Sequence, residues 1–341
     1  MWEYGWAYAP LDKNTYSSLT PSSYTGHDIT LELEYELDDM IFFINYKMNQ
    51  SKKLYVLIIM DGIQKIYEDM MLMVMHGLDS IEMPHTYLYY HVAIERGLLK
   101  NDNHTQCVFF GTRYLFYGVH IPNGSIVTDF DHLHWIHERL SSDIICNNRI
   151  MTFSSSIAEY ILQKEPSTFV DIFKFGYSKY FDFGYVQHPE YKYDICFLGT
   201  LSDRRTKIID QLKEKYNVYV HSHIEKSDNQ MTTKLKHIFS GEERATLYSE
   251  SKIVLSISFS DEYKTNCNAS RIFPAVSTGA FVISEKCLDD NQNENIDKIC
   301  MNVSLEDLYD TIDKYIKDNE EREKKRLEYY NNVKDIITLC K

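Results

Sequence analysis

The stretch SKIVLSISFSDEYKTNCNASRIFPAVSTGAFVISE, residues 251–285, carries the pattern on which the fold prediction rests. Its apolar run Ile253–Phe259 has the length of a strand and is too continuous to leave one face in water, which is typical of a buried parallel strand. A polar loop, a short helix entered at Asn268 and a second apolar strand, Ala280–Ser284, follow. Arg271 therefore stands near the start of a helix between two strands of one sheet. The amino-terminal N–H groups of such a helix, with an arginine beside them, suit a diphosphate.

Composition and charge limit the classes of protein to which the chain can belong. A chain of 341 residues is long enough for about two domains. The net charge of −14 argues against nucleic-acid binding, which needs lysine and arginine to neutralise phosphates. Seven scattered cysteines without a C-x-x-C pair favour reduced thiols. The sequence lacks a signal-peptide pattern and any run of transmembrane length, so we expect a cytoplasmic protein, or one of the host cytoplasm if its source is viral.

Apolar strand-length runs alternate with helical patterns through the first half of the chain. This alternation predicts a parallel α/β sheet with helices on both faces. The predicted strands are Leu54–Met60, Cys107–Phe110, the segment from Gly124 to Asp131, Ile150–Phe153 and Phe169–Phe175, and the predicted helices include Tyr87–Leu99, His132–Leu140 and Ser156–Gln163.

The alternation breaks in the aromatic and charged segment 178–192 and then resumes. Strands are predicted at Tyr193–Leu198 and Val218–His221, with helices at Asp203–Lys215, Glu242–Ser249 and Leu305–Leu339. We therefore predict an amino-terminal domain of residues 1–180, a linker of residues 181–192, a second domain of residues 193–320 and a carboxyl-terminal helix, residues 321–341, that packs back on the first domain. The charged run EEREKKR in that helix is interpreted as a solvated face.

A second motif, DICFLGTLSDRR, joins a strand to a helix at Gly199-Thr200. A glycine at this junction lets the backbone approach a ligand. Arg204 and Arg205 lie in the first turn of the following helix, where the helix dipole opposes a cation unless an anion is near. Together with Arg271 they indicate a phosphate site. The alternative is that they are two solvated arginines on a surface helix.

Two carboxylates, Asp129 and Asp131, stand at the tip of a short buried strand. Loops at strand ends carry function, and buried carboxylates are costly without a role. Asp129 is the candidate general base that takes the proton of an acceptor hydroxyl. Alternatively, the D-x-D pair could hold Mg²⁺ or Mn²⁺ on a nucleotide diphosphate. Asp131 could also simply cap the following helix.

Several other classes of site lack support. The histidines of one predicted helix, His132, His134 and His137, have no accompanying cysteine or carboxylate signature of a zinc site. Ser154-Ser-Ser156 lacks the glycines of a nucleophile elbow. No G-x-x-x-x-G-K-S/T loop is present, which argues against a P-loop NTPase.

Taken together, these motifs resemble the carboxyl-terminal half of GT-B glycosyltransferases. The order is strand-Gly199-Thr-x-x-x-Arg-Arg, a strand ending in Ser256-Ile-Ser, then Arg271-Ile-Phe-x-Ala-x-x-x-Gly279. The likeness is greatest to the CgeB-like (spore maturation protein-like) enzymes and more distant to the phage DNA β-glucosyltransferases. It covers about residues 193–285, reaches 124–131 and 150–177 weakly, and does not cover 1–105.

The resemblance implies a GT-B fold, in which two Rossmann-like domains with parallel sheets face each other across a cleft. It implies that the donor diphosphate is held by Gly199, Thr200, Arg204, Arg205 and Arg271, and that the segment with His237, Phe239 and Gly241 lines the base pocket. The Thr-Asp of the phage enzymes falls on Thr128-Asp129. The chain departs from the family at Pro274, where relatives carry the glutamate that holds the ribose. Either another acid, with Glu285 as the candidate, takes that role, or the donor is bound differently, or the site is degenerate.

The expected activity is transfer of a hexosyl or pentosyl group from a UDP- or GDP-sugar to a hydroxyl of a glycan, protein or small molecule. Asp129 would act as base in an inverting displacement, with no metal required. The enzyme alternative is a metal-dependent GT-A-type transferase that uses Mg²⁺ or Mn²⁺ on Asp129 and Asp131. The other alternative is a non-catalytic nucleotide-binding or scaffold module whose donor site has decayed, as Pro274 suggests.

Overall fold

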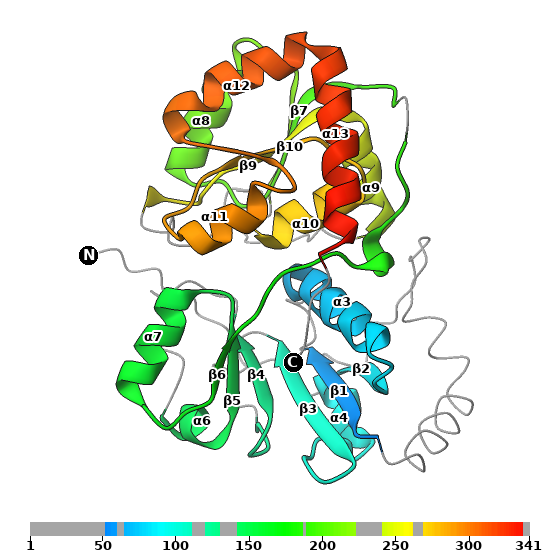
Figure 1. Ribbon diagram of the computed structural model, residues 1–341, viewed down its shortest axis with the longest axis vertical. Helices are drawn as coiled ribbons and strands as arrows, with labels where there is room; N and C mark the ends of the chain where they lie inside the picture. Colours follow the sequence, from blue (N-terminus) through cyan, green and yellow to red (C-terminus); the bar gives the residue numbers. More distant parts are fainter. Residues whose placement is uncertain are drawn as a thin grey trace, which may run out of the picture. The chain divides into compact units, whose positions relative to one another are not determined.

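The structure, a computed structural model, describes residues 52–59, 65–110, 120–129, 142–186, 189–222, 241–261 and 269–336. Its strands form two separate sheets, and every strand pair within them is parallel. Helices lie against both sheets (Figure 1). The α/β class and the two parallel sheets predicted for a GT-B fold are therefore confirmed. Both sheets fall within one compact unit, so the predicted domain boundaries stay predictions.

The first sheet has six strands in the order β2-β1-β3-β4-β5-β6. Its strands are β1 (Leu54–Ile59), β2 (His85–Tyr89), β3 (Thr105–Phe110), β4 (Ile126–Asp129), β5 (Arg149–Thr152) and β6 (Val170–Ile172). The described helices of this half are α3 (Lys65–Ser80), α4 (Tyr90–Glu95), α6 (Ser142–Asn147) and α7 (Ser155–Lys164). The central strands β1 and β3 are buried along almost their whole length, because helices cover both of their faces.

The second sheet has five strands in the order β11-β10-β9-β7-β8. Its strands are β7 (Tyr193–Leu198), β8 (Val218–His221), β9 (Ser251–Ser256), β10 (Val282–Glu285) and β11 (Met301–Val303). The helices of this half are α8 (Asp203–Lys213), α9 (Gly241–Ser249), α10 (Ala269–Ser277), α11 (Asp290–Ile296), α12 (Leu305–Lys317) and α13 (Asn319–Lys334).

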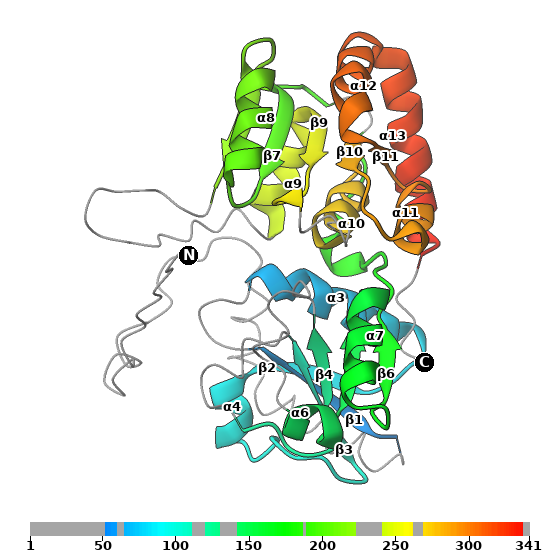
Figure 2. The ribbon, with the colours of Figure 1, turned by 90° about the vertical axis from the view of Figure 1, so that its left-hand side faces the viewer.

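Strand order reverses between β7 and β9. The chain leaves β7 for β8 on one side, then returns past β7 to place β9 on its other side. Right-handed crossovers then carry the connecting helices to opposite faces of the sheet. Accordingly α8 packs beside α12, where Tyr309 bonds Gln211 and Lys215 pairs with Asp313, whereas α10 packs with α13 (Figure 1). Figure 2 shows this half turned so that the side with α8 and α12 faces the viewer. Such a switch point is where open α/β sheets bind ligands, beyond the carboxyl ends of the strands.

The structure corrects two predicted helices. Residues 85–89 form β2, so the helix predicted at Tyr87–Leu99 is limited to α4. The alternation His85-Thr-Tyr-Leu-Tyr89, which buries Thr86 and Leu88, was the overlooked strand signal. The predicted helix from Leu305 is two helices that break at Asp318, whose side chain caps α13. The short elements α6, α11 and β11 were not predicted.

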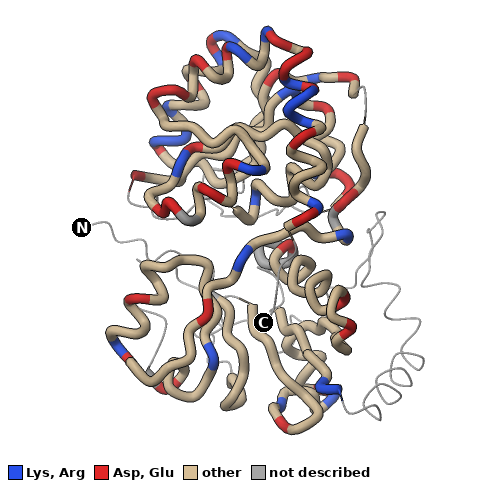
Figure 3. Tube along the Cα trace, in the orientation of Figure 1, with Lys and Arg blue, Asp and Glu red and all other residues tan. Residues whose placement is uncertain are grey.

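The charged run in α13 is not the solvated face that its composition indicated. Positive and negative residues are interspersed along this helix (Figure 3), but Arg322 and Arg326 are only 1% and 2% exposed. Arg326 donates to the carbonyl oxygens of Gly279 and Val186, and its guanidinium lies 4.2 Å from the ring centroid of Tyr185. The prediction failed because composition does not reveal a partner distant in sequence.

One buried ion pair links helices that belong to the two sheets. Both terminal nitrogens of Arg244 in α9 donate to the carboxylate of Asp69 in α3, over 2.5 and 2.8 Å. Arg244 lies in the first turn of α9, where the helix dipole disfavours a cation, and Asp69 supplies the opposing charge. In the described part of the chain, every helix is too short or too polar to span a lipid bilayer.

Candidate active site at the ends of β7 and β9

Gly199 follows β7 directly, at the switch point. Because it has no side chain, other groups can approach its backbone closely. Its φ of +151° is a conformation that other residues rarely adopt. A Cβ atom at this position would stand 2.6 Å from Nη2 and 3.3 Å from Cζ of Arg271. The absence of a side chain at Gly199 is therefore what allows the guanidinium of Arg271 to lie over the strand end.

Arg271 comes from the first turn of α10, the helix that follows β9. Its guanidinium lies 5.3 Å from the ring centroid of Phe197 in β7, and its Nη1 is buried. Among the described residues, no hydrogen-bond acceptor or acidic side chain meets that nitrogen. Burial lowers the pKa of Arg271, partly opposed by Tyr248 and Cys196. A buried N–H without an acceptor costs free energy, so this cation suits a ligand that brings negative charge.

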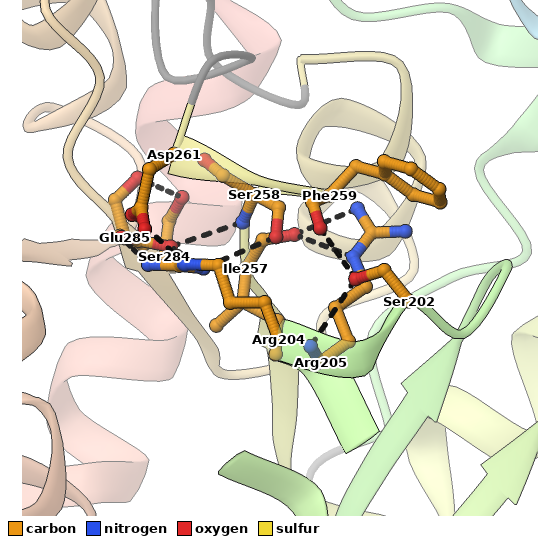
Figure 4. Close-up of polar contacts among 9 residues, drawn as sticks. All are labelled: Ser202, Arg204, Arg205, Ile257, Ser258, Phe259, Asp261, Ser284 and Glu285. Atoms are coloured by element: carbon orange, nitrogen blue, oxygen red, sulfur yellow. Dashed lines mark hydrogen bonds and ion pairs between the residues drawn. The ribbon is translucent and has the colours of Figure 1, made fainter. Parts of the chain in front are cut away.

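Arg204 is bound differently, as Figure 4 shows. Its two terminal nitrogens both donate to the carboxylate of Glu285 at the end of β10, Nη1 over 2.9 Å to Oε2. Its Nε donates to Asp261 over 3.1 Å, and Nη1 also reaches the carbonyl oxygen of Ser258. Burial lowers the pKa of Arg204, but the interactions with Glu285 and Asp261 together outweigh burial and leave it raised. In this arrangement Arg204 has its own counter-ion.

Glu285, the candidate ribose-binding acid, is only 3% exposed. Besides Arg204, its Oε2 accepts the backbone N–H of Ser258 over 3.0 Å. The carboxylate thus ties the end of β10 to the loop after β9 and to the start of α8. Its role in binding ribose stays a prediction.

Arg205 is 4% exposed and bonds backbone carbonyl groups rather than acids. Its Nη1 donates to Thr200 over 2.8 Å, and its Nη2 and Nε donate to Ile257 over 2.8 and 3.2 Å. The guanidinium also lies 5.4 Å from the ring centroid of Phe197 and 5.3 Å from that of Phe259. Burial, followed by repulsion from Arg271 and Arg204, lowers the pKa of Arg205 to about 8.

The remaining predicted site residues are only partly described. Gly241 begins α9 with a φ of +75°. The backbone of Asp129 ends β4, whereas its side chain, together with Asp131, His237 and Phe239, lies outside the described residues. Within the described part of the chain, no group of three His, Cys, Asp or Glu side chains could hold a metal ion.

The structure thus brings Gly199 and Arg271 together and pairs Arg204 with Glu285, all at the carboxyl ends of neighbouring strands. Sequence reasoning missed Phe197, whose ring meets two guanidinium groups, and the carbonyl group of Ile257. A phenylalanine inside an apolar strand gives no signal of such a contact, because the arginines that it meets come from other elements.

Comparison with known proteins finds one family model that matches this part of the chain. The model of a family described as "glycosyl transferase-like" matches residues 204–336, which include Arg204, Arg205, Arg271 and Glu285. The match spans less than half of the chain. No curated protein matches the sequence. The narrower likeness to CgeB-like and phage enzymes stays a prediction.

Solved structures of glycosyltransferases are also similar. A glycosyltransferase from Rickettsia africae ESF-5 is 11% identical, covering 83% of this chain and 94% of its own, with a TM-score of 0.41. WaaG, involved in lipopolysaccharide biosynthesis, is 9% identical, with coverages of 82% and 94% and a TM-score of 0.46. TarM of S. aureus is 10% identical, with coverages of 72% and 54% and a TM-score of 0.41. Likenesses at this level do not assign a substrate.

Proposed function

We propose that this chain is a glycosyltransferase that holds the diphosphate of a nucleotide sugar at the ends of β7 and β9, with Arg271 as its direct contact. The observation that carries the proposal is the buried Nη1 of Arg271, which has no partner among the described residues and lies beside Gly199 at the switch point. An anionic ligand would satisfy both the unpaired donor and the uncompensated charge. UDP- and GDP-sugars are the expected donors.

The proposed reaction is a displacement at the anomeric carbon of the donor sugar. The acceptor oxygen forms a bond to that carbon while the bond to the phosphate oxygen breaks, and the bonding pair leaves with the diphosphate. Arg271 stabilises the negative charge as it develops on the leaving group. Asp129, at the end of β4, takes the proton of the acceptor hydroxyl as general base. A glycan, protein or small molecule is the expected acceptor.

A thermal-shift panel with UDP, GDP, TDP, CDP and ADP at millimolar concentration tests donor binding. At least one nucleotide should raise the melting temperature of the wild-type protein, and Arg271→Ala should lose most of that increase. The control is Arg149→Ala. Arg149 lies in β5 of the first sheet, and its Nε pairs with Asp171 of the edge strand β6. Absence of stabilisation by every nucleotide would contradict the proposal.

The chemical step is tested separately with Asp129→Asn. This variant should bind the nucleotide as the wild type does and lose transfer, because the amide cannot accept the acceptor proton. Unchanged turnover would place the base elsewhere. EDTA should leave activity intact, whereas loss of activity that Mg²⁺ or Mn²⁺ restores would favour the metal-dependent alternative at Asp129 and Asp131.

A second candidate function, a nucleotide-binding module without catalysis, is favoured by Pro274. This residue is buried inside α10, at the position where the resembled family carries a ribose-binding glutamate. It places a rigid apolar ring where an acceptor of ribose hydroxyls is expected. Nucleotide binding without hydrolysis or transfer of any nucleotide sugar tested would support this second function over the first.

A further inference from the structure

The three arginines near the strand ends differ in what balances their charge. Arg204 forms an ion pair with Glu285, which is itself buried. Arg205 and Arg271 have no ion pair to a described acid, and the guanidinium carbons of both lie within 5.4 Å of the ring centroid of Phe197. Two buried cations beside one ring repel each other, and this repulsion contributes to the lowered pKa of Arg205.

Arg205 is held by backbone carbonyl groups, whereas the buried Nη1 of Arg271 has no partner among the described residues. Each of the three guanidinium nitrogens of Arg205 donates to a backbone carbonyl oxygen, and the side chain is buried. Those carbonyl groups belong to Thr200, in the turn after β7, and to Ile257, directly after β9. Arg205 therefore bridges the two strand ends between which the strand order reverses.

The bridge also fixes the orientation of the neighbouring peptide groups. In a trans peptide the C=O and N–H point in opposite directions, so a carbonyl held by Arg205 turns the next N–H away from it. For Ile257 this next N–H is that of Ser258, which donates to Glu285. In Figure 4, Arg204 and Arg205 leave adjacent positions of α8 toward different partners, Arg204 toward Glu285 and Arg205 toward Ile257.

We propose that Arg205 is a positioning residue of the anion site: it holds the turns after β7 and β9 in place and supplies a second, uncompensated positive charge without touching the ligand. This inference rests on the proposed function. It assigns direct contact to Arg271, positioning and long-range charge to Arg205, and a structural ion pair to Arg204. The site is thereby preorganised for a multiply charged anion, because both of its free charges are fixed before the ligand arrives.

Calorimetric titration with inorganic pyrophosphate, and with the nucleotide that most stabilises the wild type, tests the division of roles. Arg205→Gln keeps two N–H donors and removes the charge, whereas Arg205→Lys keeps the charge and loses the planar fork. We expect Arg205→Gln to raise the Kd for pyrophosphate about tenfold, the scale of one unit charge some 10 Å away inside a protein. Arg205→Lys should recover part of that loss.

The matched control is Arg322→Gln. Arg322 is also a buried arginine that donates to a backbone carbonyl, but it belongs to α13 and its acceptor is Tyr315 of α12. It should lower the melting temperature and leave the Kd unchanged at a temperature where the variant is fully folded. A purely structural role of Arg205 would give the same behaviour, and that result would overturn the inference.

The outcomes separate this inference from the proposed function. If the wild-type protein binds neither pyrophosphate nor any nucleotide, both are wrong. If the wild type binds, Arg271→Ala weakens binding and Arg205→Gln binds as tightly as the wild type, only the role of Arg205 is wrong. A raised Kd for both variants, with Arg322→Gln unchanged, supports both.

Discussion

Nη2 of Arg271 lies 2.6 Å from the point at which a Cβ atom on Gly199 would stand. A strand end and a helix start that are 72 positions apart in the sequence are therefore in direct contact, and the contact requires a glycine. Because real Cβ atoms do not approach other atoms so closely, any side chain at residue 199 must displace the guanidinium. The consequences for ligand binding and stability can be measured separately.

Gly199→Ala should weaken nucleotide binding at least tenfold, because the new methyl group moves Arg271 from its place over the strand end. The backbone strain at positive φ should also cost about 1 kcal/mol of unfolding free energy. Gly124→Ala is the control: its φ is +80°, but a Cβ there meets nothing within 4 Å. Calorimetry on both variants checks the prediction. A Kd for Gly199→Ala equal to that of the wild type would contradict it.

Glu285→Gln should lower the unfolding free energy by about 3 kcal/mol, because it leaves the half-buried Arg204 without its main counter-ion. Lys192→Met, which removes an exposed ion pair with Glu250, should change it far less, because solvent screens an exposed pair. Urea denaturation of both variants measures the difference. Similar small losses would mean that the Arg204–Glu285 pair stabilises no more than a surface pair does.

Asp69→Asn should destabilise the protein by about 3 kcal/mol or more, because the buried Arg244 loses the carboxylate that balances its charge and accepts from both of its terminal nitrogens. The double variant Asp69→Leu with Arg244→Met removes both charges and should recover most of that loss. A double-mutant cycle of the single variants Asp69→Leu and Arg244→Met with this double variant, measured by urea denaturation, gives the coupling energy. Additive losses would show that the pair does not link α3 to α9 energetically.

Stability should fall at high pH partly through Tyr248. Burial raises the pKa of this fully buried tyrosine to about 12, whereas an unfolded tyrosine ionises near 10. The stability that the neutral phenol contributes is therefore complete below pH 10 and is lost as the pH rises from 10 to 12. Tyr248→Phe should flatten the fall in unfolding free energy over that range, by on the order of 1 kcal/mol per pH unit. Parallel pH profiles would contradict this.

Much of the fold could be predicted because its signals are local. The apolar runs predicted as strands at 54–60, 193–198 and 253–259 mark the positions of β1, β7 and β9, although β9 ends at Ser256, and the helix start that carries Arg271 lies between β9 and β10. The errors arose where two local patterns compete, as at residues 85–89, or where a helix break depends on a single capping residue, Asp318.

The sequence by itself determined that two runs of alternating strands and helices form parallel sheets, and that Gly199 and Arg271 each stand at a junction between a strand and a helix. These features follow from side-chain periodicity and backbone freedom, which act over a few residues. Only the tertiary structure decided that, of Arg204, Arg205 and Arg271, it is Arg271 that keeps a buried nitrogen without a partner among the described residues. Arg204 and Arg205 are adjacent and chemically identical, yet one meets Glu285 and the other the carbonyl group of Ile257. Those partners lie 81 and 52 residues away, and strand order alone brings them within reach.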